Sequence, residues 1–216
     1  MIADLEPQDG AVERALAEEF PGLALRTVAV RTAGGRTPRG LRNRMRELSD
    51  RFHGASAIAL RSRPVPQAYR VFYRQVGLDP DADRTPAEQA GLDRLMRGAF
   101  RGGDRLGDAL LLAVVETGVP VWGFDEAALD GPLALRAAGT GETLPAEGGY
   151  AHDVPEGRLV LADGAGPVAV LFGRVSERHR AGRATTAVRL AAVQVPGVPD
   201  AHVDEALWLA AEALSE

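Results

Sequence analysis

The spacing of apolar residues along the 216-residue chain predicts helices early and strands late. Apolar residues recur every three or four positions in several segments, as they do on one face of a helix. Residues 108–116 are apolar on nearly every side, which predicts a buried central helix. The other predicted helices cover residues 11–20, 38–53, 64–74, 85–97 and 200–214.

Short apolar or alternating runs predict strands, most of them in the second half of the chain. The predicted strands cover residues 23–30, 133–136, 158–162, 168–172 and 188–195. Between the third and the fourth, Asp163-Gly-Ala-Gly is typical of a hairpin turn. These elements predict an α/β (α+β) fold: one compact domain over residues 1–216, with early and central helices, a late mixed sheet containing a hairpin, and a C-terminal helix.

Local signals mark several helix ends. Thr85-Pro-Ala-Glu is typical of a capping box, with a hydroxyl at the N-cap and a carboxylate three residues later. Asp108 and Asp125 are predicted to cap the helices that follow them. Gly118 is expected to end the central helix. The aromatic residues of segment 64–74 are expected to pack in the core rather than to stack on bases.

Composition excludes several chemistries. The chain has no cysteine, which excludes disulfides, thiolate nucleophiles and cysteine-bound metals. All 25 basic residues are arginine, which excludes a Schiff-base or P-loop lysine. The four histidines lack the i, i+4 spacing of a helical metal site, so we expect no such site. No leader is expected from Met1–Pro7 and no membrane span from the short apolar runs, so a cytoplasmic location is expected.

The net charge of −5 conceals a strongly basic segment. Residues 26–74 contain twelve arginines but only two acids, Glu47 and Asp50. Such a segment suits a phosphate-rich partner. It is equally consistent with a solvated helix face and with arginines that pair with acids elsewhere. The candidate RNA-binding residues are Arg39, Arg42, Arg46, Arg70, Arg74 and Arg178.

Several motifs occur in an order and spacing that together resemble one known family. They are Tyr69-Arg-Val-Phe-Tyr-Arg-Gln-Val-Gly-Leu-Asp-Pro, Arg84-Thr-Pro-Ala-Glu, Leu95-Met-Arg-Gly, Gly118-Val-Pro-Val-Trp-Gly-Phe-Asp, Gly141-Glu, Ser176-Glu-Arg and Thr185. Over about residues 20–214 the chain resembles the tRNA-binding and editing domain of the phenylalanyl-tRNA synthetase beta subunit, the B3/B4 domain. It looks like a free-standing relative of that domain.

The resemblance implies a pocket that hydrolyses a mischarged aminoacyl-tRNA ester without metal or cofactor. Glu177 precedes Thr185 by eight residues, as in the synthetase, so the resemblance implies catalytic roles for this pair. The chain departs from the family where Trp122 replaces the editing histidine and where Leu110 and Leu111 replace a Thr-Asn pair. The synthetase domain hydrolyses tRNA-Phe mischarged with tyrosine, and these departures call the same specificity into question for this chain. The implied substrate-pocket residues are Leu111, Trp122, Phe124, Ser176 and Thr186.

Three functional hypotheses follow. The first is a trans-acting deacylase, with the aminoacylated 3′ end of a tRNA and its amino-acid moiety as partners. The second is a non-catalytic module that binds tRNA, which the loss of polar pocket residues favours. The third is a pocket for a free amino acid or similar small molecule, which the sequence pI near 5.5 favours. The sequence specifies neither the amino acid, nor the tRNA, nor the oligomeric state.

Overall fold

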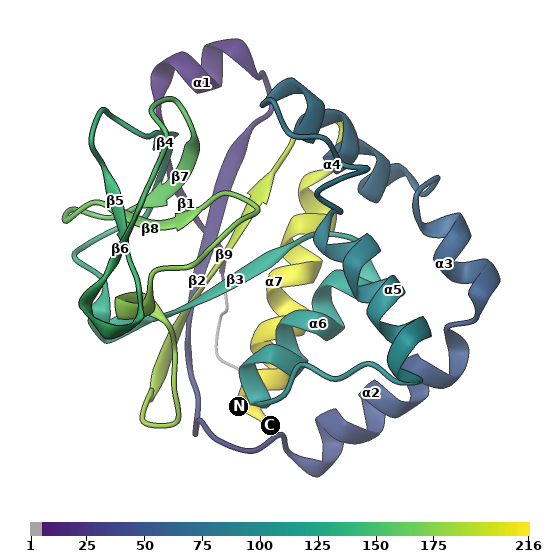
Figure 1. Cartoon of the computed structure of the whole chain (residues 1–216). Helices are drawn as coiled ribbons and strands as arrows, with labels where there is room; N and C mark the ends of the chain where they lie inside the picture. The colour runs from purple at the N-terminus through teal and green to yellow at the C-terminus, as the bar shows by residue number, and fades with distance from the viewer. Residues whose placement is uncertain (1–5) are drawn as a thin grey trace.

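The computed structural model describes residues 6–216. Residues 1–5 lie outside the described residues. They make up most of the Met1–Pro7 segment from which no leader was expected. A seven-stranded sheet runs through the molecule, and helices α2 to α7 lie together on one side of it (Figure 1). The fold is α+β, as the apolar pattern predicted.

The main sheet has the strand order β3-β9-β2-β1-β4-β7-β8. Strand β1 lies parallel to β4, whereas the other described neighbours in this sheet are antiparallel. The predicted mixed sheet and its β7–β8 hairpin are therefore confirmed. The strands are β1 (Gln8–Val12), β2 (Ala24–Arg31), β3 (Val121–Asp125), β4 (Ala134–Ala137), β7 (Leu159–Ala162), β8 (Pro167–Val170) and β9 (Ala187–Gln194), with β5 (Thr143–Pro145) and β6 (Ala151–Asp153) forming a separate small sheet.

All six predicted helices are present, with small shifts at their ends, and α3 was not predicted. The helices are α1 (Arg14–Glu19), α2 (Arg39–Arg51), α3 (Gly54–Leu60), α4 (Pro64–Gln75), α5 (Pro86–Arg97), α6 (Arg105–Thr117) and α7 (Asp200–Ser215). Helix α1 is shorter than expected because residues 11 and 12 pair with β4 as part of β1. Tertiary strand pairing therefore overrides the helical spacing there.

Helix α6 is the buried central helix that the sequence predicted. It packs against α7, α2, α5 and β3. Ala109 and Ala113 of α6 are fully buried, as are Ala206 and Ala210 of α7. Small side chains let two helix axes approach closely, so these alanines allow α6 to lie directly on α7. Helix α7 in turn contacts β2 and β9 and connects the helical layer to the sheet.

Three of the four predicted helix-end signals are confirmed and one is wrong. Thr85 and Glu88 form the capping box of α5, Asp125 accepts a hydrogen bond from the amide of Ala127, and Gly118 ends α6 with φ +81°. Asp108 does not cap α6. Asp104 does so, accepting a hydrogen bond from the Gly107 amide (2.7 Å), because α6 begins one turn earlier than the apolar run suggests.

The aromatic residues of α4 belong to the core, as predicted. Tyr69, Phe72 and Tyr73 are buried. The Tyr69 hydroxyl donates a hydrogen bond to the carbonyl of Val193 in β9 (2.7 Å) and so links α4 to the sheet. Burial raises the pKa of Tyr69 well above its ordinary value, so the phenol stays neutral. No helix in residues 6–216 combines the length and the apolar character that a membrane crossing requires.

The turn after β4 is expected to make stability depend on acid pH. Arg136 donates two hydrogen bonds to the Glu142 carboxylate (2.7 and 2.6 Å), and these hold the pKa of Glu142 below its ordinary value of 4.5. The stabilisation is therefore complete above pH 4.5 and is lost as pH falls through the lowered pKa. Glu142→Gln should reduce the free energy of unfolding by less than about 1 kcal/mol at neutral pH. It should also make the free energy of unfolding depend less on pH at acid pH.

Urea unfolding between pH 3 and pH 7, roughly the range that brackets carboxylate titration, measures this effect. The control is Glu156→Gln, which removes an exposed carboxylate that has no ion pair among the described residues. Parallel pH profiles for the wild type and the Glu142 variant would contradict the assignment.

Candidate functional site

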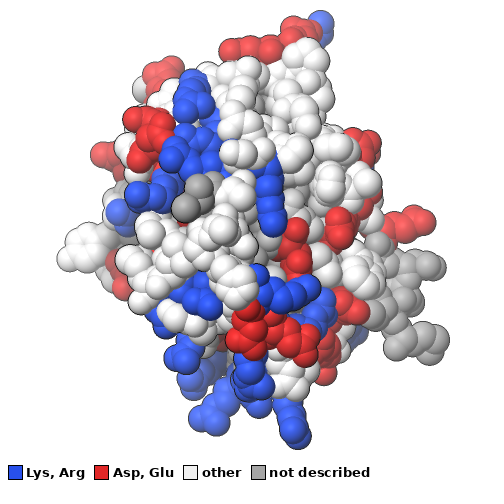
Figure 2. Space-filling model, turned by 90° about the vertical axis from the view of Figure 1, so that its right-hand side faces the viewer, with Lys and Arg blue, Asp and Glu red and all other residues white. Residues whose placement is uncertain are grey.

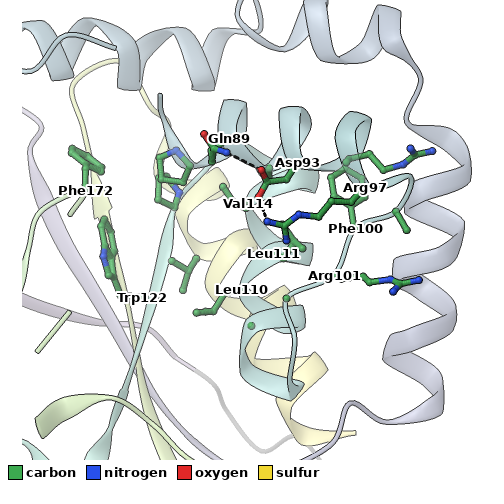
Figure 3. Close-up of a pocket in the computed structure, with 18 of the residues that line it drawn as sticks. Gln89, Asp93, Arg97, Phe100, Arg101, Leu110, Leu111, Val114, Trp122 and Phe172 are labelled. Atoms are coloured by element: carbon green, nitrogen blue, oxygen red, sulfur yellow. Dashed lines mark hydrogen bonds and ion pairs between the residues drawn. The ribbon is translucent and has the colours of Figure 1, made fainter. Parts of the chain in front are cut away.

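A cavity of about 440 Å³ lies between α5, α6, β3 and the turn after β8 (Figure 3). Its apolar wall comes from α6 and β3, which the core holds in place. Leu110, Leu111 and Val114 of α6 face Trp122 of β3 and Phe172 of the turn. A cavity of this size can hold an amino-acid side chain or a nucleobase.

The aromatic side of the cavity is held by a cluster behind it. The rings of Trp122 and Phe172 lie 5.8 Å apart between centroids, and Phe172 also contacts Tyr73 at 4.5 Å. Phe172 has φ +58°, a left-handed conformation that a bulky residue adopts only when its surroundings enforce it. Trp122 is 9% exposed. Its ring is therefore a largely fixed part of the cavity wall.

The opposite wall is polar and comes from one face of α5. Gln89, Asp93 and Arg97 follow one another at four-residue spacing, which places them on the same side of the helix. Gln89 donates a hydrogen bond to Asp93 (2.8 Å), and the Arg97 guanidinium lies 3.7 Å from the same carboxylate. Figure 3 shows this row across the cavity from Trp122. The cavity therefore suits a ligand with an apolar body and a polar or charged end.

The loop 98–104 forms the mouth of the cavity. The Gly102 amide donates to the Asp108 carboxylate (2.6 Å), and Thr37 donates to the other oxygen of that carboxylate. Asp108 thus ties the loop to α6 and to the segment before α2. This is the structural role it has in place of the predicted cap.

The same loop borders a groove that runs toward α2. This groove, of about 420 Å³, is lined by Arg42 and Arg46 of α2 and by Arg101 of the loop. Ala99, Phe100 and Arg101 line both the groove and the cavity, so the two border the same loop. Figure 2 shows basic side chains projecting at the lower end of the molecule, where α2 lies in Figure 1. A groove lined by three arginines and by two carboxylates, Asp50 and Asp108, thus lies next to an aromatic cavity.

The structure groups only part of the predicted RNA-binding set. Arg39, Arg42 and Arg46 are exposed along α2. Arg70 does not belong with them: its guanidinium is 6% exposed and is bound by Asp81 and Glu88. Arg74 is paired with Asp81 (3.5 Å), and Arg178 lies in the short 3-10 helix after β8 and does not line the α2 groove. The twelve arginines of segment 26–74 therefore fall into three groups. Six form ion pairs, three form an exposed row on α2, and Arg31, Arg36 and Arg63 are exposed elsewhere.

The two residues predicted to be catalytic do not line the Trp122 cavity. Glu177 lines a different hollow and pairs with Arg180 (3.2 Å). Thr185 lines a third recess, where its hydroxyl donates to Asp125 (2.8 Å) and accepts from the Gly182 amide (2.9 Å). The structure therefore leaves Glu177 and Thr185 apart from the cavity and in separate hollows.

The predicted pocket residues are also divided. Leu111 and Trp122 line the cavity together. Phe124 is fully buried in the core, and Ser176 is fully buried with no hydrogen-bond partner for its hydroxyl. Thr186 is exposed on the segment before β9. The five residues that the motifs assigned to one pocket therefore do not line the same cavity.

The polar wall and the Phe172 contact were not predicted from the sequence. The spacing of Gln89, Asp93 and Arg97 behind the capping box would have indicated one polar face of α5. Nothing in the sequence indicated Phe172, whose place depends on a left-handed turn after β8. Within residues 6–216, no three histidine, aspartate or glutamate side chains gather closely enough to hold a metal ion.

One buried ionisable pair lies outside these hollows. His179 is 3% exposed, and its Nε2 lies 3.4 Å from the Asp163 carboxylate. Burial lowers the pKa of His179, so the ring is neutral at physiological pH. This pair therefore belongs to the packing of the turn against the β7–β8 hairpin.

Comparison with known proteins places the chain in a family. The family model described as the B3/4 domain matches residues 68–213. A crystal structure of an N-terminal fragment of the phenylalanyl-tRNA synthetase beta subunit from Pyrococcus horikoshii matches with 15% sequence identity and a TM-score of 0.45. The match covers 96% of this chain and 52% of that fragment, so the chain spans about half of the fragment's length. No curated protein sequence matches the chain.

The family match covers most of the chain, including α5, α6 and β3, which form the cavity. It agrees with the motif resemblance and gives the chain a tRNA-related context. The chain belongs to the B3/4 domain family, the family of the phenylalanyl-tRNA synthetase beta-subunit domain that its motifs resemble.

Proposed function

We propose that this protein binds the aminoacylated 3′ end of a tRNA and hydrolyses the ester in trans. The observation that carries the proposal is that the α2 groove and the Trp122 cavity border the same loop, residues 99–101. Arg42, Arg46 and Arg101 would contact backbone phosphates in the groove. The Trp122 ring would stack on the terminal adenine or on an aromatic amino acid.

The polar wall supplies the group that the amino-acid moiety needs. Asp93 is the one carboxylate among the described residues that line the cavity. An ionised carboxylate can accept a hydrogen bond from the α-ammonium group or orient a water toward the ester carbonyl. The ester is already activated, so holding it beside an oriented water can supply much of the rate. Glu177 and Thr185 remain the alternative pair that the family resemblance implies.

A deacylation panel tests the proposal and locates the site. tRNAs charged with tyrosine, phenylalanine or methionine would be incubated with the wild type, Asp93→Asn and Glu177→Gln. Release of one amino acid that is lost only in Asp93→Asn supports the cavity as the reaction site. Loss only in Glu177→Gln moves the reaction to the Glu177 hollow. Release equal to buffer for every tRNA would contradict hydrolysis.

Removal of the aromatic wall is expected to weaken binding of the same RNAs. Trp122→Ala should lower affinity for the aminoacyl-tRNA by about tenfold, because one stacking contact is lost. Filter binding at several salt concentrations measures this, with Arg63→Gln as the control because Arg63 is exposed and lines neither the groove nor the cavity. Equal affinities for the wild type and Trp122→Ala would show that the ring does not contact RNA.

A free amino acid is the second candidate ligand. Asp93 lines the cavity together with Arg94, Arg97 and Arg101, so groups of both charges could contact a zwitterion. The apolar residues Leu110 and Leu111 would contact its side chain. Calorimetric binding of a free amino acid by a protein that binds no tRNA would favour this candidate over the first.

A further inference from the structure

A separate recess lies where three loops meet. It has a volume of about 250 Å³ and is bordered by the loop after β2, the first turn of α6 and the loop before β9. The Arg105 amide donates to the carbonyl of Gly35 (3.2 Å), which joins two of the loops. Gly34 has φ +58°, and a Cβ there would lie 2.7 Å from the Arg183 carbonyl oxygen. Glycine is therefore required where the first and third loops touch.

Each of these three segments contributes one arginine to the recess: Arg36, Arg105 and Arg183. In the part of the chain that the structure describes, none of the three pairs with a carboxylate. Other arginines of this acidic chain are paired, for example Arg44 with Glu212 (2.8 Å). Three guanidinium groups without a carboxylate partner among the described residues therefore border one recess.

The arginine at the start of α6 has an unused buried donor. Arg105 Nε is buried and has no hydrogen-bond partner, while its Nη1 donates only a long bond (3.4 Å) to the Leu214 carbonyl. A buried donor without a partner costs free energy, and a ligand oxygen could satisfy it. Asp104 is the one carboxylate among the lining residues, and it already accepts the capping hydrogen bond from Gly107. The recess therefore has a net positive charge.

We infer that this recess is an anion site that binds a phosphate group. Guanidinium groups bind phosphate through charge-assisted hydrogen bonds, and three of them from separate loops can surround one group. The volume is below the roughly 300–1,000 Å³ of sites for drug-sized ligands, which suits a phosphate and little more. The phosphate could belong to an RNA backbone, because Gly103 borders both this recess and the α2 groove, or to a small phosphorylated molecule.

Titration of the full chain with inorganic phosphate tests the inference. Resonances of the arginine Nε–H groups would be followed by NMR in the wild type and in the double variant Arg36→Gln/Arg183→Gln. Both arginines are exposed, so the variant should fold, and its circular dichroism and Tm would be compared with those of the wild type. The control Arg63→Gln/Arg84→Gln removes the same charge at exposed positions outside the recess.

The wild type and the control should bind phosphate saturably, with the Arg105 Nε–H resonance shifting. The double variant should bind at least about tenfold more weakly, because two charge-assisted contacts are lost. Absence of saturable binding in the wild type, or equal affinity in the wild type and the double variant, would overturn the inference. Neither result depends on deacylation, so the proposed function and this site can fail separately.

A second arm identifies the source of the phosphate. The salt dependence of tRNA binding would be measured for the same variants. If the recess contacts the RNA backbone, the slope of log K against log salt should fall by about 1.5 in the double variant, since each contact contributes roughly 0.7–0.9. An unchanged slope, together with lost phosphate binding, assigns the recess to a small phosphorylated molecule.

Discussion

Replacement of Arg70 by methionine is expected to lower the free energy of unfolding by about 3 kcal/mol. The Arg70 and Glu88 side chains are 6% and 7% exposed, and their charged atoms lie 2.7 Å apart. Without the guanidinium, Glu88 would keep a buried carboxylate whose remaining cationic partner is Arg61 at 3.2 Å. Glu88 also accepts hydrogen bonds from the amide and hydroxyl of Thr85, so the start of α5 would weaken as well.

Equilibrium urea unfolding measures this loss, and a neighbouring arginine supplies the control. Arg74 contacts the same Asp81 that binds Arg70, but it is 52% exposed. Arg74→Met should therefore leave stability nearly unchanged. The double variant Arg70→Met/Glu88→Gln should recover part of the lost stability, because the unpaired charge is removed too. Similar losses of unfolding free energy for Arg70→Met and Arg74→Met would show that burial does not make the Arg70–Glu88 pair more important for stability.

Gly107→Ala is expected to destabilise the protein by about 2 kcal/mol although alanine is the better helix former. Gly107 lies in the first turn of α6, and a Cβ there would lie 2.3 Å from the carbonyl oxygen of Gly102. A Cβ on Gly102 would in turn lie 2.0 Å from the Gly107 carbonyl carbon. Backbone meets backbone at this point, so no side-chain rotation can relieve the overlap. The loop at the mouth of the Trp122 cavity must move away from α6.

The sign of the change in stability shows whether the backbone overlap or the higher helix propensity of alanine dominates. Gly54→Ala places a methyl group at the start of α3, where a Cβ meets no atom within 4 Å. That control should be neutral or slightly stabilising by thermal unfolding. Gly107→Ala should also perturb tRNA binding, because Gly107 itself lines the cavity. An increase in Tm for Gly107→Ala would contradict the tight loop–helix contact.

The elements predicted correctly are those with strong local signals. Helix α5 carries its own capping box, and α6 is apolar on nearly every side, so both could be located from the sequence. Strand β1 was missed because Val12 belongs to a helical pattern locally, and its strand pairing depends on residues more than a hundred positions away. Strand β3 was missed because Gly123 weakens its pattern. Its conformation depends on pairing with β9.

The candidate site was predicted less well because it depends on relations between distant segments. Trp122 and Leu111 line one cavity, whereas Glu177 lies in a different hollow, although the resemblance implied one pocket for all three. The charge of segment 26–74 was visible in the sequence, whereas the partner of each arginine was not. The sequence does not distinguish Arg70 from Arg42, yet Arg70 is buried in an ion pair and Arg42 lines an open groove.

The place of β1 and β2 in the sheet affects how this protein can be divided. The family match begins at residue 68, yet β2 pairs with β9 over eight residues and β1 joins β2 to β4. A fragment cut at the start of the match would lack two central strands and expose an unpaired edge on both β9 and β4. Open strand edges promote aggregation through pairing between molecules. The cooperative folding unit is thus larger than the recognisable family segment, and expression boundaries should include β1.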